Sequence, residues 1–355
     1  MATLQDIADR LGVSKGTVSK ALNGSSDISE ALQKTILETA VEMGYTKLRR
    51  RTDAEKKLCI LIENIEYKEP HQLGYDIILG FRQMAEPAGY TVEVVPVTQD
   101  FQRNTPYDVF MLQNHYLGAF VLGFSLPSPW MTDFCTSRTL TVLYDNYISA
   151  NPNIAHVGID NTEGIELAVS HLHQLGHKRI GYLSGALGSY VMQVRHKAFF
   201  QALRREGLRA DPSCAGSSYY ITECIDRHLP RLLHSGTTAI LCSHDMIANA
   251  AMIQCQQMGY RVPEDVSIIG FDDLPICAYT SPPMTTIRQD RIQIGKSGYY
   301  ALESLRNHVL IGSLQLHAQL IIRNSTGTAP ASAHPAASSS SPSGSVPSGS
   351  VSLEK

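Results

Sequence analysis

Between residues 58 and 325 the sequence alternates short apolar runs with longer stretches of helical periodicity. Runs such as KLCILI, LTVLYDN and DVSIIGFDD have the length and composition of buried strands, and each is followed by a segment with amphipathic helical spacing. Such alternation predicts parallel sheets covered by helices. Because the pattern runs twice, we predict two doubly wound lobes of a periplasmic-binding-protein-like α/β domain. The expected N-lobe is about 58–157 plus 288–325, and the expected C-lobe is about 158–287.

Three further zones flank this α/β region. Residues 1–46 show short helical patterns separated by turns, and residues 47–57 form a charged segment that we expect to be a hinge or linker. Residues 326–355 are rich in Ser, Pro, Ala and Gly and poor in apolar residues. Such a composition cannot bury enough surface to offset its ordering entropy, so we expect a disordered tail.

Charge and cysteine usage narrow the class of protein. Residues 1–57 hold 10 Lys+Arg against 8 Asp+Glu, whereas the rest of the chain holds 20 against 25. A small basic end on an acidic body favours a nucleic-acid contact at the N-terminus. The seven cysteines show no C-x-x-C spacing, and several lie in apolar runs, which is typical of reduced, buried thiols. With no signal peptide or membrane-length apolar stretch, we expect a cytoplasmic protein without a membrane partner.

The stretch LGVSKGTVSKALNG predicts a helix-turn-helix unit. Thr3 can cap a first helix that ends at Gly12, and Ser14 can cap a second helix that ends before Asn-Gly. In the second helix the apolar residues face inward, while Lys15, Gly16, Thr17, Ser19 and Lys20 remain outside. Lysines and hydroxyls can bind bases or phosphates, and a glycine permits close approach to a groove. A solvated polar face on a small helical bundle would give the same pattern.

The chain resembles the lac-repressor (LacI/GalR) family of bacterial transcriptional regulators. The resemblance is carried by the N-terminal motif just quoted and by three later stretches, HLHQLGHKRIGYLSG, VPEDVSIIGFDDL and SPPMTTIRQD. It implies that Lys15, Gly16 and Lys20 read bases. The residues that it implies as further DNA contacts are Thr3, Gln5, Ser14, Thr17, Ser19 and Asn23.

Two positions depart from the family pattern. Lys20 stands where the family usually has Arg, and a lysine lacks the planar fork that reads guanine. The linker lacks the family's hinge motif with its leucine wedge and instead contains Arg49, Arg50 and Arg51. These arginines can track phosphates or a narrow minor groove, or they can belong to a merely solvated linker. Without the wedge we predict less DNA bending than in the family generally.

Polar residues at strand ends predict a ligand site between the lobes, because open α/β sheets bind ligands at the carboxyl ends of their strands. The resemblance aligns Asp145, Arg195 and Asp245 with effector-binding positions of the family. Asp272, at the end of another strand, completes a set suited to vicinal hydroxyls. The loop after the first strand adds three weaker candidates, namely Glu63, Asn64 and Tyr67. His244 replaces the Asn that usually precedes Asp245.

The sequence therefore predicts a ligand-responsive transcriptional regulator, and we expect it to be a repressor. We expect a homodimer on a pseudo-palindromic double-stranded operator, and a sugar or sugar derivative as effector, with a purine as an open alternative. No catalytic or phosphate-binding signature, cofactor motif or metal site is apparent, and the family pattern accounts for the histidines of HLHQLGH by packing. The alternatives are a solute-binding protein without a DNA role and a DNA-binding headpiece fused to an enzyme.

Overall fold

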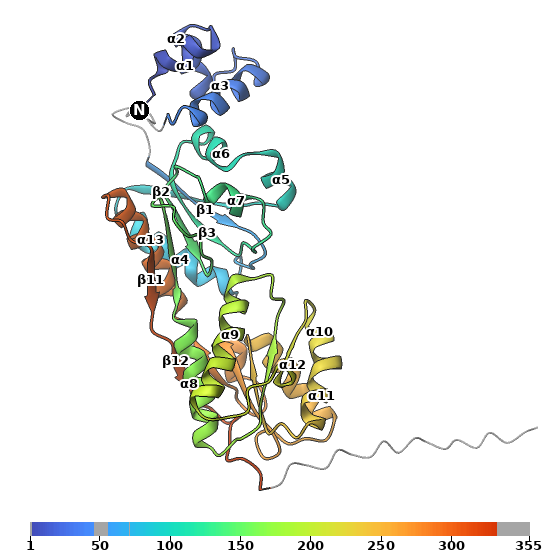
Figure 1. The fold of residues 1–355 in the computed structure, drawn as a ribbon. Helices are drawn as coiled ribbons and strands as arrows, with labels where there is room; N and C mark the ends of the chain where they lie inside the picture. The colour runs from blue at the N-terminus through green and yellow to red at the C-terminus, as the bar shows by residue number, and fades with distance from the viewer. Residues whose placement is uncertain (1, 46–55, 71, 332–355) are drawn as a thin grey trace, which may run out of the picture.

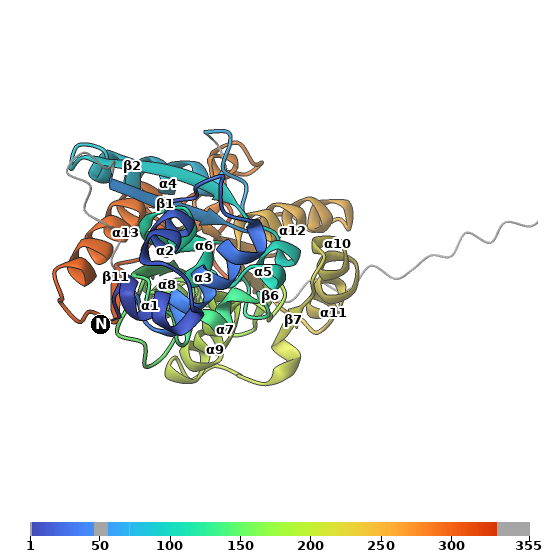
Figure 2. The same ribbon diagram turned by 90° about the horizontal axis from the view of Figure 1, so that it is seen from above.

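The computed structural model describes residues 2–45, 56–70 and 72–331. Three bodies follow one another along its length in Figure 1: a small helical headpiece, an N-lobe and a C-lobe. Seen from above in Figure 2, the headpiece lies over the N-lobe. None of the helices in these residues is both long and apolar enough to traverse a bilayer.

The headpiece consists of three helices, α1 (Leu4–Leu11), α2 (Lys15–Leu22) and α3 (Glu30–Glu42). Thr3 caps α1 in a reciprocal capping box with Asp6, and Gly12 ends that helix in the left-handed conformation, φ 66°. Ser14 caps α2 by accepting from the Thr17 amide at 3.0 Å. The caps and turn expected from the sequence are therefore confirmed. The inward residues of the three helices share one core, which includes Ile7, Val18, Leu22, Ile36 and Leu37.

The N-lobe is built on a sheet with the strand order β11-β5-β4-β3-β1-β2. Its strands are β1 (Lys56–Ile62), β2 (Tyr90–Pro96), β3 (Tyr116–Leu122), β4 (Thr141–Tyr144), β5 (Ile154–Ile159) and β11 (Ser313–Leu316). All of its strand pairs are parallel. Alternate residues of β1 face opposite layers, so Leu58 and Ile60 belong to one apolar core and Cys59 and Leu61 to another.

Helices cover both faces of this first sheet. One face carries α4 (Leu73–Ala85) and α13 (Arg291–Arg306), which pack closely on each other because Gly80 and Gly295 leave no Cβ between them. The other face carries three short helices, which are α5 (Gln99–Asn104), α6 (Tyr107–Gln113) and α7 (Trp130–Phe134).

The C-lobe repeats this architecture with the strand order β12-β10-β9-β8-β6-β7. Its strands are β6 (Ile180–Ser184), β7 (Ala215–Ser217), β8 (Ala239–Cys242), β9 (Ser267–Asp272), β10 (Thr285–Arg288) and β12 (Gln319–Ile321). Only β12 runs antiparallel to its neighbour. Its helices are α8 (Asn161–Gln174), α9 (Tyr190–Arg205), α10 (Ile221–Glu223), α11 (Leu229–His234) and α12 (Asp245–Gln257), with short helical turns at η1 (Pro212–Cys214), η2 (Cys224–His228) and η3 (Pro275–Ala278).

The two-lobed α/β fold is as expected, but the boundaries between the parts differ. β1 begins at Lys56, inside the segment 47–57 that was expected to be linker. β5 stays in the first sheet to Ile159, and α13 and β11 also belong to the N-lobe, but β12 pairs with β10 in the second sheet. The expected N-lobe segment 288–325 is therefore divided between the lobes.

The expectation of a disordered tail from residue 326 onward is wrong for residues 326–331, which the structure describes. Thr326 contacts His171, the Gly327 carbonyl lies 3.0 Å from His177 Nε2, and the Ala329 amide donates to the Leu175 carbonyl. These contacts are polar and do not depend on apolar side chains, which explains why composition failed to indicate them. Residues 332–355 lie outside the described residues.

Candidate effector cleft and DNA-binding surface

The outward face of α2 carries the residues predicted to read DNA. Lys15, Gly16 and Lys20 are exposed, while Thr17 and Ser19 are half-buried. A Cβ on Gly16 would meet only Ser14 Oγ at 3.5 Å, so nothing in the headpiece itself requires a glycine there. A requirement from outside the chain, such as a groove floor, accounts for it better.

The remaining headpiece candidates surround this face. Lys20 Nζ forms an exposed ion pair with Asp27 at 2.5 Å, and Asn23 Nδ2 donates to the Ser19 carbonyl at 2.6 Å. Gln5, next to the capped start of α1, donates to Asp9. Lys20 must exchange Asp27 for DNA if it binds there. The other DNA-binding candidates, Arg49, Arg50 and Arg51, lie outside the described residues.

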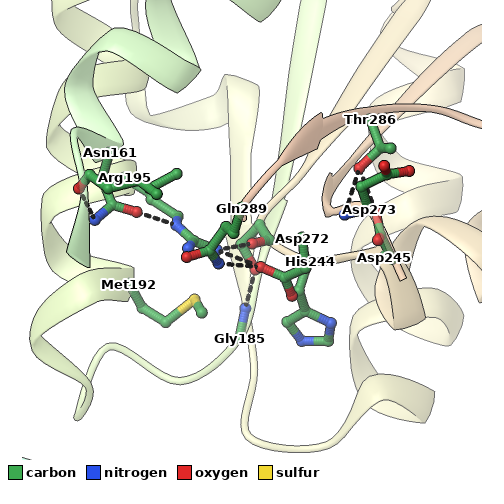
Figure 3. A network of polar contacts seen from close by, with 12 residues as sticks. Asn161, Gly185, Met192, Arg195, His244, Asp245, Asp272, Asp273, Thr286 and Gln289 are labelled. Atoms are coloured by element: carbon green, nitrogen blue, oxygen red, sulfur yellow. Dashed lines mark hydrogen bonds and ion pairs between the residues drawn. The ribbon is translucent and has the colours of Figure 1, made fainter. Parts of the chain in front are cut away.

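Between the lobes, Arg195 lies at the centre of a buried polar network (Figure 3). It projects from the second turn of α9 and keeps only 2% of its surface exposed. Nε donates to Asn161 Oδ1 at 2.7 Å and Nη1 donates to the Ser243 carbonyl at 2.6 Å. These two bonds satisfy part of the desolvated guanidinium and fix its plane.

The carboxylate of Asp272 connects this arginine to the other lobe. Its Oδ1 lies 3.6 Å from Arg195 Nη1 and accepts from Gln289 Nε2 at 2.6 Å. Gln289 in turn accepts from the hydroxyl of Tyr144 at 3.2 Å, and Tyr144 ends β4 of the N-lobe. Burial raises the pKa of Asp272, while Arg195 opposes that shift. The network therefore runs from Arg195 and Asp272 of the C-lobe to Tyr144 of the N-lobe.

Asp145 follows β4 of the N-lobe and interacts electrostatically with Arg195 of the C-lobe. Its φ of 52° turns the chain sharply after β4, a conformation that costs energy for a non-glycine residue. Gly158 on the neighbouring strand makes room for it, because a Cβ there would lie 2.7 Å from Asp145 Oδ1. Burial raises the pKa of Asp145 to about 6, and the positive charge of Arg195 partly counteracts the shift.

Asp245 occupies a different environment from the other predicted ligands. It is fully buried, accepting from Thr286 Oγ1 at 2.6 Å and from the Leu274 amide at 2.8 Å. Gly270 accommodates its carboxylate, since a Cβ there would come within 2.2 Å of Oδ1. Burial, followed by the neighbouring Asp272, raises the pKa of Asp245. Its contacts are those of a residue that joins β10 and the loop after β9 to α12.

His244, directly before Asp245, lies near Arg195 and Gly185. It caps α12, with Nδ1 accepting from the Ile247 amide at 3.3 Å, and a Cβ on Gly185 would lie 3.8 Å from its Nε2. Burial and then Arg195 lower the pKa of His244 to about 4, so the ring is neutral near pH 7. The sequence marked this position only as a departure from the family.

The weaker candidates gather in a separate pocket of the N-lobe. Glu63, Asn64 and Tyr67 line a hollow of about 380 Å³ between the ends of β1 and β2. Glu63 is 5% exposed and accepts from Gln99 Nε2 at 3.1 Å and Gln102 Nε2 at 2.8 Å. The three residues line the same hollow, and their role as effector contacts stays a prediction. None of their described hydrogen bonds reaches Arg195.

The two lobes also contact each other directly. The Leu126 amide donates to the Gly188 carbonyl at 3.0 Å, and the rings of Tyr147 and Tyr190 stack with centres 6.0 Å apart. Tyr147 also stacks on His156 at 4.4 Å. Sequence reasoning missed this contact, and it missed Asn161 and Gln289, because no local pattern separates such residues from ordinary helix and loop positions.

The histidines of HLHQLGH serve packing in this structure. His177 is fully buried, with Nδ1 2.9 Å from Thr238 Oγ1, and its other nitrogen faces Ser267 and Gly327. Within residues 2–45, 56–70 and 72–331, no group of three His, Cys, Asp or Glu residues is arranged to hold a metal ion.

Comparison with known proteins finds a family match for the headpiece and another for the two-lobed region. Residues 3–47 match "Bacterial regulatory proteins, lacI family", and residues 169–326 match "Periplasmic binding protein-like domain". The Escherichia coli K12 HTH-type transcriptional repressor CytR is 30% identical over 336 residues, which cover 93% of this chain and 97% of the relative. The HTH-type transcriptional repressor PurR of Aliivibrio salmonicida is 26% identical over 92% of this chain and 99% of its own.

Solved structures share the whole arrangement. A transcriptional regulator CelR–cellobiose complex superposes with a TM-score of 0.67 at 22% identity, covering 92% of this chain and all of its own. The lac repressor dimer bound to operator and the anti-inducer ONPF gives 0.63 at 21% identity over 92% and 99% of the two chains.

The fold and site define a helix-turn-helix DNA-binding unit joined to a two-lobed effector-binding domain. The chain belongs to the LacI family of bacterial transcriptional regulators. It is a transcriptional repressor of that family, and the family is not enzymatic.

Proposed function

We propose that the protein represses transcription as a homodimer on a pseudo-palindromic operator, and that a small polyhydroxylated effector between the lobes controls its DNA affinity. A sugar or sugar derivative is the proposed class, and the sugar part of a nucleoside offers the same hydroxyls. The observation that carries this proposal is the convergence of Asp145, just after β4, and Asp272, at the end of β9, on Arg195 of α9.

These groups suit neighbouring hydroxyls. Within the described part of the chain, the hydrogen bonds of Arg195 use Nε and Nη1, so Nη2 is available to a ligand oxygen. The carboxylates of Asp145 and Asp272 can accept hydrogen bonds from ligand hydroxyls. The neutral ring of His244 can make a further hydrogen bond. Solved proteins of the same fold contain cellobiose or, in a LacI family regulator from Enterococcus faecium, ribose, which supports the sugar class.

We further assign Asp245 to the fold and not to the effector. Both of its oxygens are already bonded to the chain, so a ligand bond there would displace a protein bond. Tyr147 and Tyr190 close over the ligand from opposite lobes. An effector that alters this closure changes the relation of the lobes, and operator and effector affinities must then be coupled reciprocally.

The C-lobe also offers a surface for the proposed dimer. Met246 and Ile253, seven residues apart on one face of α12, are 44% and 48% exposed. Tyr279 nearby is 86% exposed, and Gln256 of α12 donates to the Ser281 carbonyl of the same loop at 2.6 Å. An apolar patch of this kind favours a protein contact. Light scattering that finds only monomers would contradict the homodimer.

The effector assignment is tested by thermal-shift screening of a sugar and nucleoside panel on wild type, Asp145→Asn and Asp245→Asn. We expect a stabilising compound to lose most of its shift in Asp145→Asn. Asp245→Asn should melt lower without ligand but keep the shift. If both variants retain the full shift, Asp145 is not a ligand residue.

A further inference from the structure

The headpiece contacts the N-lobe directly, through the packing of α3 against α6 (Figure 1). The apolar core of the headpiece extends into the lobe, because it includes Val109 of α6, which is 6% exposed, and Leu112 packs against the same cluster. Tyr45, just after α3, belongs to that shared core. The two bodies are therefore joined by side-chain packing as well as by the chain between them.

A charged contact reinforces this packing at the end of α3. Gly44 has φ 69°, and a Cβ there would come within 1.4 Å of Arg138 Nη1, so the guanidinium lies directly against the glycine. The last turn of α3 has no basic residue of its own. The carboxyl end of a helix carries partial negative charge, which Arg138 of the lobe is placed to complement.

The lobe holds Arg138 in place through α6. Asp108 Oδ1 accepts from Ser137 Oγ and Thr139 Oγ1, both at 2.6 Å, and Oδ2 accepts from the Arg138 amide at 3.0 Å. The loop bearing Arg138 is thus fixed to the helix bearing Val109 and Leu112. We call these four residues, Asp108, Val109, Leu112 and Arg138, the docking platform.

We propose that the docking platform is a binding surface for the chain's own headpiece, and that docking there sets the orientation of α2 relative to the lobes. α3 lies between α6 and the other two headpiece helices in Figure 1. Docking therefore leaves the outward face of α2 free for DNA. It selects among headpiece orientations and does not block the DNA-binding surface.

The contact between the headpiece and the docking platform can open and close. A cavity of about 600 Å³ remains between the two bodies, lined by Val41 and Tyr45 on the headpiece side and by Leu112, Arg138 and Asn153 among others on the lobe side. Loosely packed contacts of this kind open at lower free-energy cost than the filled cores on either side.

The platform is also connected to the 380 Å³ pocket that the weaker effector candidates line. Gln99 and Gln102 of α5, the helix directly before α6, donate to Glu63 in the 380 Å³ pocket. Gln102 Oε1 accepts from the Trp130 amide at 3.2 Å, which joins α5 to α7. A change at Glu63 is thereby passed to α5 and α7, and because α7 packs against α6, it can reach the platform without using residues 46–55. This link rests on the proposed effector function, whereas the dock itself does not.

Hydrogen exchange of the full-length chain tests the dock. Leu112→Asp places an unpaired charge in the shared core, so amides at 41–45 should exchange about tenfold faster. Gln113→Asp adds the same charge at the next, exposed position of α6 and should change nothing there. If Leu112→Asp also loosens α6, Arg138→Ala gives the deciding result, because it removes only the contact with Gly44. Wild-type exchange at 41–45 in Arg138→Ala and Leu112→Asp would overturn the proposal.

Glu63→Gln tests the link to the pocket, with Glu66→Gln on the same loop as control. The new amide faces the donor groups of Gln99 or Gln102, so exchange should rise at α5 and, by about twofold to threefold, at 41–45. Exchange that stays at the wild-type rate at 41–45 would refute the link. These readouts need no effector, so a panel without a binding compound would disprove the effector assignment and leave the dock standing.

Discussion

The guanidinium of Arg195 lies over the ring of Phe271, with its central carbon 3.5 Å from the ring centre. The ring covers one face of a cation that is otherwise surrounded by polar atoms, so the plane of the fork is fixed before any ligand arrives. Phe271 immediately precedes Asp272 in β9, and the same strand therefore positions both the arginine and its carboxylate partner.

Arg195→Lys should weaken both stability and effector binding. A lysine keeps the charge but cannot bond Asn161 and the Ser243 carbonyl at once or lie flat on the ring. We expect a loss of about 1–3 kcal/mol in the free energy of unfolding, measured by urea denaturation. Arg205→Lys is the matched control, because Arg205 pairs with Glu166 at an exposed site. Equal stability of the two variants would argue against a structural role for the fork.

Asp145 should make stability depend on pH. Its pKa is raised from an ordinary value of 3.8 to about 6, so between these values the folded state holds a proton that the unfolded state has lost. Its contribution to the free energy of unfolding therefore falls as pH rises from about 4 to about 6. In Asp145→Asn this pH-dependent contribution should vanish. Urea unfolding at several pH values between about 4 and about 6 measures it. A profile parallel to that of wild type would contradict the raised pKa.

Gly158→Ala should impair the effector site specifically. The new Cβ would lie 2.7 Å from Asp145 Oδ1, so the carboxylate must move from the position that Gly158 allows. We expect a loss of affinity for whichever panel compound stabilises wild type, measured by calorimetry. Gly312→Ala is the control, because its Cβ would meet no atom within 4 Å. Unchanged affinity in Gly158→Ala would mean that Asp145 does not contact the ligand.

The lysines of α2 should determine the salt dependence of DNA binding. Lys15→Ala and Lys20→Ala should each lower the magnitude of the slope of log affinity against log salt by about 1. A lysine that binds a phosphate releases one counterion from the DNA, and each variant no longer releases it. The DNA is selected from a randomised pool with wild-type protein. Lys34→Ala, an exposed lysine of α3 near Glu38, should leave the slope unchanged. Identical slopes for all three variants would place the DNA surface elsewhere.

DNA bending should be smaller than in the family generally, because the segment 47–57 lacks the leucine wedge that opens a minor-groove step. A circular-permutation gel assay on the selected operator measures the bend. A kink equal to that of a wedge-bearing repressor would refute this prediction.

The local chemistry of the headpiece was readable from the sequence because caps and turns act within a few residues. Thr3, Gly12 and Ser14 have the roles that their side chains and spacing indicate. The alternation of strands and helices likewise predicted the two lobes, since that pattern reports burial on both faces of a parallel sheet.

Features that depend on distant partners were not readable. Asp245 was predicted as a ligand from its place at a strand end and from the family resemblance, and nothing in the local sequence indicated that its carboxylate bonds residues 274 and 286. β12 has only 3 residues, too few for a recognisable period, so its membership of the second sheet was missed. The defined conformation of residues 326–329 depends on hydrogen bonds to His177 and Leu175, which lie about 150 positions earlier in the chain.

The return of the chain to the C-lobe through β12 places the end of the described chain beside the C-lobe, away from the headpiece (Figure 1). Thr3, in contrast, belongs to the surface that we propose to face the operator. A fluorescent reporter or an immobilisation handle fused behind residue 331 would therefore project away from bound DNA. The same cargo fused before Thr3 would compete with the nucleic acid for space, so biosensors built from this protein should be tagged at the carboxyl end.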